Sequence, residues 1–280
     1  MALVNLNYVL KKAQEEKYAV CAFNVENMEM VQAVISAAEE MNSPVILQTT
    51  PSTLRYAEPK LYFAIVSALA QQTKIPVVMH LDHGDSFVLA SKAYRTGYTS
   101  VMIDGSKLLL QENMMLTKSV VDMCRPTDVT VEAEIGCIGG KEDELTSDNI
   151  YTVPEEAKLF AEATEVDALA VAIGTAHGVY KAKPCLNVER LKEIRQMVDI
   201  PLVLHGTSGV PDETVKQCIE NGICKVNYAT DLRIAFTKGV TGVLENKEIF
   251  DPKKYMAAGR EAVKACAMAR MRVCGSADKA

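Results

Sequence analysis

The sequence predicts an α/β protein built as a closed (β/α)8 barrel, a TIM barrel, and three observations support this. Short apolar runs rich in Val and Ile alternate eight times with longer amphipathic segments, as expected for strands buried on both faces and joined by helices. No GxGxxG motif follows the first run, which argues against an open dinucleotide-binding sheet. Polar side chains instead follow nearly every run, and barrel enzymes place their active sites at these strand ends.

Each expected strand is a short, nearly continuous apolar run. Prolines stand directly before three of them, after Ser43, Ile75 and Ile200. Eight strands alternating with helices are the number that closes a barrel, although an open doubly wound sheet has the same alternation. The expected strands are Ala19–Asn24, Val45–Gln48, Val77–Asp82, Ser100–Asp104, Val129–Ile135, Ala168–Gly174, Leu202–His205 and Cys224–Asn227.

The segments between the strands have helical periodicity. Pro154 followed by two glutamates is a typical helix start, and Gly97 and Gly222 are typical helix ends. An extra helix is expected over residues 5–17, and one or two more over residues 252–273. With no internal repeat or linker, residues 1–280 are expected to form one domain. The helices between strands are expected over Met28–Asn42, Lys60–Thr73, Phe87–Gly97, Asn113–Cys124, Pro154–Glu165, Val188–Val198 and Asp212–Gly222.

The composition excludes several classes of protein. The 280 residues are 49% hydrophobic and 24% charged, with 36 Asp+Glu against 30 Lys+Arg and a net charge of -6. This is ordinary for a globular protein and leaves no general basic surface for nucleic acid or an anionic membrane. No apolar run approaches the roughly 18 residues of a membrane span. Eight cysteines without a CxxC pair, and no secretory signal, predict reduced thiols and a cytoplasmic location.

Three of the four histidines lie at or just after the ends of expected strands. His83 and His177 follow the third and sixth strands, His205 ends the seventh, and each is followed by glycine. A single such histidine is usually a structural residue, but three that converge on one rim resemble the ligands of a catalytic zinc site. His80 lies inside its strand and is expected to be structural.

The adjacent residues Asp82 and His83 raise a geometric question. Strict alternation along a strand places neighbouring side chains on opposite faces. Both can therefore serve one site only if His83 lies beyond the last paired residue of its strand, which the following Gly84 would permit.

Carboxylates are expected on the same rim as the histidines. Asp82 and Asp104 end the third and fourth strands, and Glu132 and Glu134 share one face of the fifth. A carboxylate beside a metal is held ionised and can act as a base or orient a ligand. We interpret Asp104 and Glu132 as hydrogen-bond acceptors that orient their neighbours.

Two further segments could contact a substrate. The glycine-rich, acidic stretch Gly136–Glu144 is either a solvated turn or a loop that covers the site and carries Glu142 toward it. Gly206–Gly209 and Asn227–Asp231 combine small residues, hydroxyls and a helix start. Such segments after strands seven and eight are the usual phosphate site of a barrel enzyme.

At these residues the sequence resembles the class II, metal-dependent ketose-bisphosphate aldolases, in the fructose- and tagatose-bisphosphate branch. The resemblance runs from about residue 3 to the C-terminal Cys-Gly-Ser-Ala. It is carried by the ordered motifs Ala22–Asn24, His80–Gly84, Val101–Ser106, Val131–Gly136, Gly139-Gly140, Ala172–Gly178, Leu204–Gly209 and Lys225–Asn227.

The resemblance implies a role for each residue type. One Zn²⁺ per subunit would be bound by His83, His177 and His205, with Glu134 as an alternative ligand. Asp82 would transfer a proton at the C4 hydroxyl, and Glu142 at C3 of dihydroxyacetone phosphate. A monovalent cation, Na⁺ or K⁺, would lie near the phosphate of that triose. The residues implied to bind or position substrate are Asn24, Thr50, Gly178, Gly206, Thr207, Ser208, Asn227, Tyr228, Ala229 and Thr230.

The substrate is not decided by the sequence. Tagatose-type members often carry a second histidine where this chain has Gly84-Asp85, and Thr207 stands where Ala or Gly is usual. Arg260 resembles an arginine of the fructose-bisphosphate members that reaches from one subunit into the active site of its neighbour and binds the distal phosphate there. It could equally be an exposed helix residue. A homodimer or homotetramer is therefore expected.

An aldolase that releases dihydroxyacetone phosphate fits the sequence better than the alternative functions do, although its substrate has alternatives. An arginine that binds phosphate would also bind a sulfonate, so 6-deoxy-6-sulfofructose 1-phosphate is an alternative substrate. A non-catalytic partner subunit would be expected to have lost ligands, yet the histidines and Asp82 are present. A metal-dependent hydrolase would not require the phosphate site. A Schiff-base aldolase needs a desolvated lysine at a strand end, whereas Lys225 is followed by two more strand residues.

Overall fold

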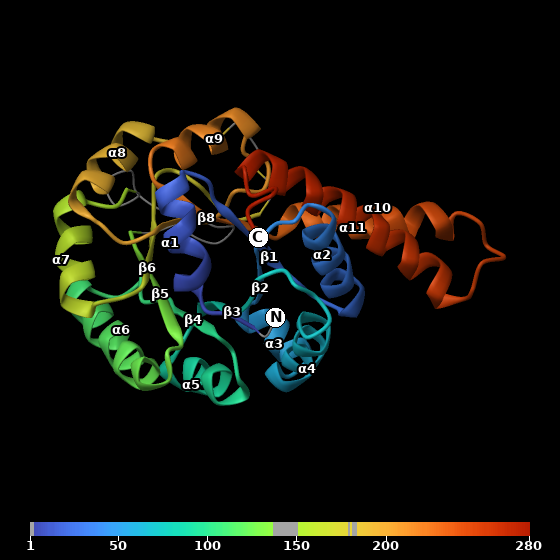
Figure 1. Cartoon of the computed structure of the whole chain (residues 1–280), viewed down its shortest axis with the longest axis horizontal. Helices are drawn as coiled ribbons and strands as arrows, with labels where there is room; N and C mark the ends of the chain where they lie inside the picture. Colours follow the sequence, from blue (N-terminus) through green and yellow to red (C-terminus); the bar gives the residue numbers. More distant parts are fainter. Residues whose placement is uncertain (1–2, 137–150, 179, 181–183) are drawn as a thin grey trace.

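The computed structural model describes residues 3–136, 151–178, 180 and 184–280, and its centre is a closed barrel of eight parallel strands in sequence order (Figure 1). The predicted fold class is therefore confirmed. The strands are β1 (Val20–Asn24), β2 (Val45–Thr49), β3 (Val77–Gly84), β4 (Ser100–Ile103), β5 (Thr130–Ile135), β6 (Ala168–Val171), β7 (Leu202–Leu204) and β8 (Ile223–Tyr228).

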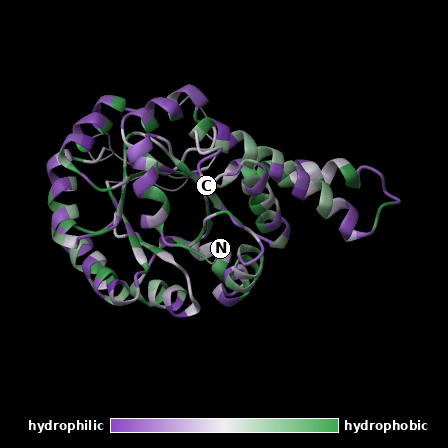
Figure 2. Cartoon of the chain, in the orientation of Figure 1, coloured by the Kyte–Doolittle hydropathy of each residue, from purple (hydrophilic) through white to green (hydrophobic). Residues whose placement is uncertain are grey.

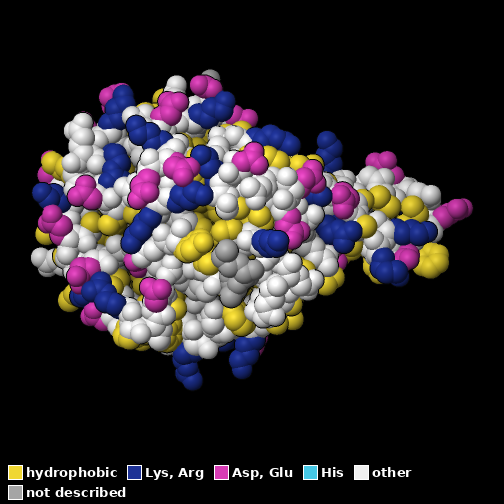
Figure 3. Space-filling model, viewed as in Figure 1, with side chains coloured by type: hydrophobic (Ala, Val, Ile, Leu, Met, Phe, Trp, Pro, Cys, Tyr) yellow, Lys and Arg dark blue, Asp and Glu magenta, His cyan; other side chains and the backbone are white. Residues whose placement is uncertain are grey.

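Helices surround the barrel, and hydrophilic residues lie on their outer faces (Figure 2). Lys and Arg side chains are intermixed with Asp and Glu over the face shown in Figure 3. No helix among the described residues is long and apolar enough to cross a membrane. The helices are α1 (Leu6–Glu16), α2 (Met28–Glu40), α3 (Pro51–Tyr56), α4 (Pro59–Ala70), α5 (Phe87–Thr96), α6 (Leu110–Cys124), α7 (Pro154–Thr164), α8 (Val188–Met197), α9 (Asp212–Glu220), α10 (Thr230–Leu244) and α11 (Pro252–Cys274), with a 3₁₀ turn at Arg125–Thr127.

Helix α1 closes the N-terminal end of the barrel. Its buried residues, Leu6 and Leu10 among them, form one apolar cluster with Val20, Ile46 and Val78 of the strands. Because this end is filled by side chains, ligands can reach the barrel only from the ends of the strands where the polar residues lie.

Helices α10 and α11 form an arm that projects from the barrel (Figure 1). Their close approach depends on glycine, since a Cβ on Gly239 would lie 2.6 Å from the carbonyl oxygen of Ala258. The sequence predicted only the start of α10. The reason is that α10 packs on α11, and Leu232 is its one fully buried residue, so α10 lacks the apolar stripe of a helix that faces a barrel.

Two other helices differ from expectation. Helix α3 was not predicted, because its six residues are too few to show a period, although Thr50 caps its N-terminus and Pro51 is its first residue. The C-terminal segment, expected as one or two helices, is the single 23-residue helix α11.

Candidate active site

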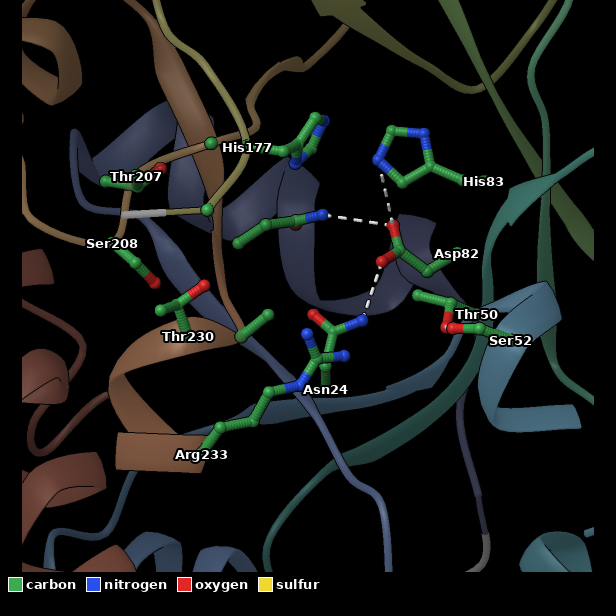
Figure 4. Close-up of a pocket in the computed structure, with 14 residues that line it drawn as sticks. Asn24, Thr50, Ser52, Asp82, His83, His177, Thr207, Ser208, Thr230 and Arg233 are labelled. Carbon is green, nitrogen blue, oxygen red and sulfur yellow. Dashed lines mark hydrogen bonds and ion pairs between the residues drawn. The ribbon is translucent and has the colours of Figure 1, made fainter. Parts of the chain in front are cut away.

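A cavity of about 490 Å³ opens at the C-terminal ends of the strands (Figure 4). Twelve of the predicted site residues line it, and two lining residues, Ser52 and Arg233, were not predicted. The complete set is Asn24, Thr50, Ser52, Asp82, His83, His177, Gly178, Gly206, Thr207, Ser208, Asn227, Ala229, Thr230 and Arg233.

The three predicted histidine ligands meet beside this cavity: His83 and His177 line it, and the buried His205 lies directly next to them. One ring nitrogen from each of His83, His177 and His205 lies within 4.8 Å of the others, and His83 Nε2 is 2.9 Å from His205 Nδ1. The second ring nitrogens are held by the carboxylates expected to orient them: His83 Nδ1 lies 2.9 Å from Asp104, and His205 Nε2 lies 2.8 Å from Glu132. Such contacts set the tautomer and aim the free nitrogens of metal-binding histidines.

A β-bulge explains how Asp82 and His83 serve the same cavity. Leu81 pairs with Val101 but Gly84 pairs with Ile103, so β3 carries one extra residue against β4. His83 takes up this residue with a left-handed backbone, φ 49°, which interrupts the alternation of side chains. The expectation that β3 ends before His83 was wrong, since the strand continues to Gly84 and the bulge turns His83 inward.

The bulge requires glycine at position 84. A Cβ on Gly84 would lie 2.4 Å from the carbonyl oxygen of Met102, and that oxygen belongs to the neighbouring strand. We expect Gly84→Ala to lower the free energy of unfolding by about 1–3 kcal/mol, as overpacking does. Urea denaturation measures this. The control is Gly242→Ala on α10, where a Cβ meets no atom within 4 Å; equal stability of the two variants would contradict the prediction.

Asp82 is held as an ionised base. Its Oδ2 accepts a hydrogen bond from Asn24 Nδ2 at 2.7 Å (Figure 4), and its Oδ1 accepts one from Asn227 Nδ2 at 3.1 Å. Burial alone would raise the pKa of Asp82, but the positive charges of His83 and neighbouring groups, with the Asn24 bond, keep this pKa below its usual value.

The donor set suits a divalent cation. Burial disfavours a charged imidazole, yet the surrounding carboxylates, Asp82 foremost, raise the pKa of His83 to about 10, so the cluster stabilises positive charge. Glu134 is buried, and its Oε2 lies 3.8 Å from His83 Nδ1 without a hydrogen-bond partner in the described chain. Burial and the charge of Asp104 raise the pKa of Glu134 to about 8. A cation would satisfy this unpartnered oxygen.

A buried ion pair supports the histidines from inside the barrel. Lys225 Nζ lies 2.8 Å from Glu132 Oε2 and 3.1 Å from Glu132 Oε1, and both side chains are fully buried. His80, expected to be structural, lies in the same layer, with Nδ1 2.8 Å from Ser100 Oγ. Lys225 does not line the cavity, so it is placed to balance the charge of the carboxylate that orients His205.

The predicted anion site also lies on the cavity. Gly206 has φ 63° and approaches the backbone of Ala176 closely. A Cβ on Gly206 would lie 2.7 Å from the carbonyl oxygen of Ala176. Tyr180, which sequence reasoning missed, joins the same two loops by hydrogen bonds of 2.7 Å to Ala176 N and Gly206 O. Ser208 Oγ accepts from the amide of Asp231, in the first turn of α10. A helix start beside small residues is suited to bind phosphate.

Seven predicted residues do not line this cavity. His205, Glu132, Glu134 and Asp104 belong to the histidine cluster described above, and the other three are Tyr228, Arg260 and Glu142. Tyr228 is fully buried, with its hydroxyl 3.6 Å from Cys274 Sγ, because alternation along β8 turns it away from the barrel interior; its expected place in the substrate set stays a prediction. Arg260 lies on α11 and donates to Gln32 at 3.3 Å. Its expected role concerns a neighbouring subunit and stays a prediction. Glu142 lies outside the described residues.

Comparison with known proteins agrees with this site. The family model for class II fructose-bisphosphate aldolase matches residues 4–279. The chain belongs to the class II fructose-bisphosphate aldolase family. Among solved structures, the YdjI aldolase from Escherichia coli K12 is 37% identical, with a TM-score of 0.90 over 99% of both chains. The fructose-bisphosphate aldolase Fba from Campylobacter jejuni is 26% identical, with a TM-score of 0.86 over 100% of this chain and 97% of that one.

The family explains why this aldolase has its polar residues on one rim. Class II aldolases are metal-dependent enzymes, and the cluster of His83, His177 and His205 could hold such a metal. The same cavity contains Asp82 and the small-residue loops suited to a sugar phosphate. The barrel of this aldolase thus brings the three histidines, Asp82 and the small-residue loops together at one end.

Proposed function

We propose that this aldolase catalyses the zinc-dependent, reversible cleavage of a ketose 1,6-bisphosphate, fructose or tagatose 1,6-bisphosphate, into dihydroxyacetone phosphate and glyceraldehyde 3-phosphate. The observation that carries the proposal is a cluster of three histidines, two of them on the wall of a cavity that also contains Asp82 and the small-residue loops. Other ketose 1-phosphates, 6-deoxy-6-sulfofructose 1-phosphate among them, are the second candidate substrates, because the anion site would bind their shared C1 phosphate equally.

Different residues of this chain would bind the metal and the substrate phosphate. His83, His177 and His205 would hold zinc, with Glu134 as an alternative ligand. The ion would supply Lewis-acid stabilisation of the negative charge that develops on substrate oxygens when the C3–C4 bond breaks. The loops at Gly178 and Gly206–Ser208, with the start of α10, would bind the C1 phosphate and fix the position of the reacting carbons.

Asp82 would accept the proton of the C4 hydroxyl during cleavage and return it during condensation. Asn24 and Asn227 donate to its two oxygens, which fixes the carboxylate and leaves lone pairs free to accept a proton. Glu142 would exchange the proton at C3 of dihydroxyacetone phosphate. A monovalent cation beside the phosphate and a homo-oligomeric state are further proposals that rest on the family resemblance.

Removal of the metal is expected to abolish cleavage. Without the ion, no group among the described cavity residues replaces its charge at the substrate oxygens, so turnover should fall by at least about 10³-fold. Dihydroxyacetone phosphate release is measured after chelation and dialysis, and again after zinc is restored. Circular dichroism confirms that the chelated protein stays folded. Full activity of protein shown to be free of metal would refute the proposal.

A further inference from the structure

A second cavity, of about 500 Å³, lies at the end of the barrel opposite the active-site cavity. Its walls come from the C-terminal parts of α1, α8 and α9 and from the first residues of β8 (Figure 1). Ile223 and Cys224 begin β8 and line this cavity, whereas Asn227 lies near the other end of the same strand and lines the active-site cavity. The second cavity therefore lies at the N-terminal end of the barrel, beside the helix α1 that closes this end.

Positive charge predominates on the wall of this second cavity. Lys17, Lys192 and Arg195 line it. Among its described lining residues, Glu220 is the one carboxylate. Lys192 lies 2.7 Å from Glu189, which balances its charge, but Lys17 has no ion-pair partner in the part of the chain that the structure describes. A wall with more positive than negative charge attracts an anionic ligand.

Arg195 is held in place with hydrogen-bond donors left over. Its Nη1 donates to the carbonyl oxygen of Ile200 at 2.9 Å. A Cβ on Gly222 would overlap Cδ of Arg195, so the stem of the arginine lies directly against this glycine. The carboxylate of Asp199 is fully exposed and approaches Nη2 only to 4.0 Å, and Nε has no hydrogen-bond partner among the described residues. Burial lowers the pKa of this guanidinium, because water solvates its charge incompletely.

The wall as a whole suits an organic molecule that carries a phosphate group. A phosphate monoester has nearly two negative charges at neutral pH and three acceptor oxygens, which match Arg195 and Lys17 better than the single charge of a carboxylate does. Ile219 and Ile223 supply apolar surface, and Gln196 supplies a side-chain amide. A cavity of this size and mixed lining is typical of a site for a small organic ligand.

We propose that this cavity is a second ligand site, which binds a small phosphorylated molecule through Arg195 and Lys17. The site is separate from the one proposed for cleavage, because the two cavities share no lining residue among those that the structure describes. It uses neither the metal nor the substrate, so it does not depend on the proposed function. A ligand bound there would contact β8, the strand from which Asn227 donates to Asp82.

The test measures binding of phenyl phosphate, whose ring matches the isoleucines and whose phosphate matches the two cations. The methyl NMR resonances of Ile219 and Ile223 in the zinc-loaded protein report on this cavity, since no isoleucine is among the described residues that line the active-site cavity. We expect both resonances to shift. Arg195→Gln should raise the dissociation constant about 10- to 100-fold, the effect of losing charge-assisted hydrogen bonds. Lys17→Gln, at an exposed cation, should raise it about 2- to 5-fold.

Matched variants and probes make the result specific. Arg195→Lys keeps the charge but not the planar fork and should bind more tightly than Arg195→Gln. Lys216→Gln removes an exposed lysine of α9 that does not line the cavity and should leave the dissociation constant within about twofold of wild type. Circular dichroism checks that each variant is folded. Phenol, which has the ring without the charge, should bind at least about 10-fold more weakly than phenyl phosphate.

Several outcomes would overturn the proposal. Unshifted resonances of Ile219 and Ile223, equally tight binding of phenol, or an unchanged dissociation constant in Arg195→Gln would each exclude an anion site in this cavity. Benzoate carries a carboxylate on the same ring, and tighter binding of benzoate than of phenyl phosphate would exclude phosphate as the group that is recognised.

Discussion

Replacing Asp82 with alanine is expected to lower kcat by about 10²- to 10⁴-fold, the range of a general acid–base group. The variant removes the carboxylate that Asn24 and Asn227 hold in the cavity. It leaves the three proposed zinc ligands unchanged. Zinc content per chain should therefore stay near the wild-type value. Steady-state cleavage assays and metal analysis of the same preparation measure the two effects.

The contrast with a nearby carboxylate makes this result informative. Asp85 is exposed, three residues further along the chain, so Asp85→Ala should keep nearly full turnover. Asp82→Asn preserves the size of the side chain but removes the base, and it should be as impaired as the alanine variant. A kcat within about threefold of wild type in Asp82→Asn would exclude Asp82 from proton transfer.

Replacing Lys225 with methionine should cause the largest loss of stability. Lys225 and Glu132 are both fully buried and 2.8 Å apart, so the variant leaves a carboxylate without its counter-charge inside the barrel. Breaking a buried pair from one side costs about 3–5 kcal/mol. Urea denaturation of the metal-free protein should show this difference in the free energy of unfolding.

A double variant separates lost charge balance from lost packing. Lys225→Met with Glu132→Gln removes both charges and should recover a large part of the stability, because no isolated ion remains in the barrel. Lys216→Met, at an exposed ion pair of α9, should change stability by less than about 0.5 kcal/mol. A loss below about 1 kcal/mol in Lys225→Met would show that this ion pair contributes little.

The barrel and most of the cavity could be predicted from the sequence because both depend on local patterns. Continuous apolar runs mark strands that are buried on both faces, and the first polar residues after each run must lie on one rim. His177 and His205 were found in this way, each from its own strand end. To predict that they converge, it was enough to know that the sheet closes into a barrel.

What the sequence could not show depends on register and on helix placement. Nothing in the order Asp82-His83 reveals a bulge, since it arises from pairing with β4. Arg233 lies a full turn beyond the end of β8 on a helix of which only the start was predicted, so it was not distinguished from an exposed arginine. Its spacing of three from Thr230 places the two on one face of a helix, and this signal could have identified it.

The bulge in β3 also has a mechanical consequence. Asp82 and His83 are joined by one peptide unit, so deformation of the barrel leaves the separation of their Cα atoms nearly unchanged. Glu134 lies on β5 and His205 directly follows β7, so their separations from His83 vary whenever the barrel deforms. Deformation that alters the other separations in the cavity will therefore leave the spacing between Asp82 and His83 nearly constant.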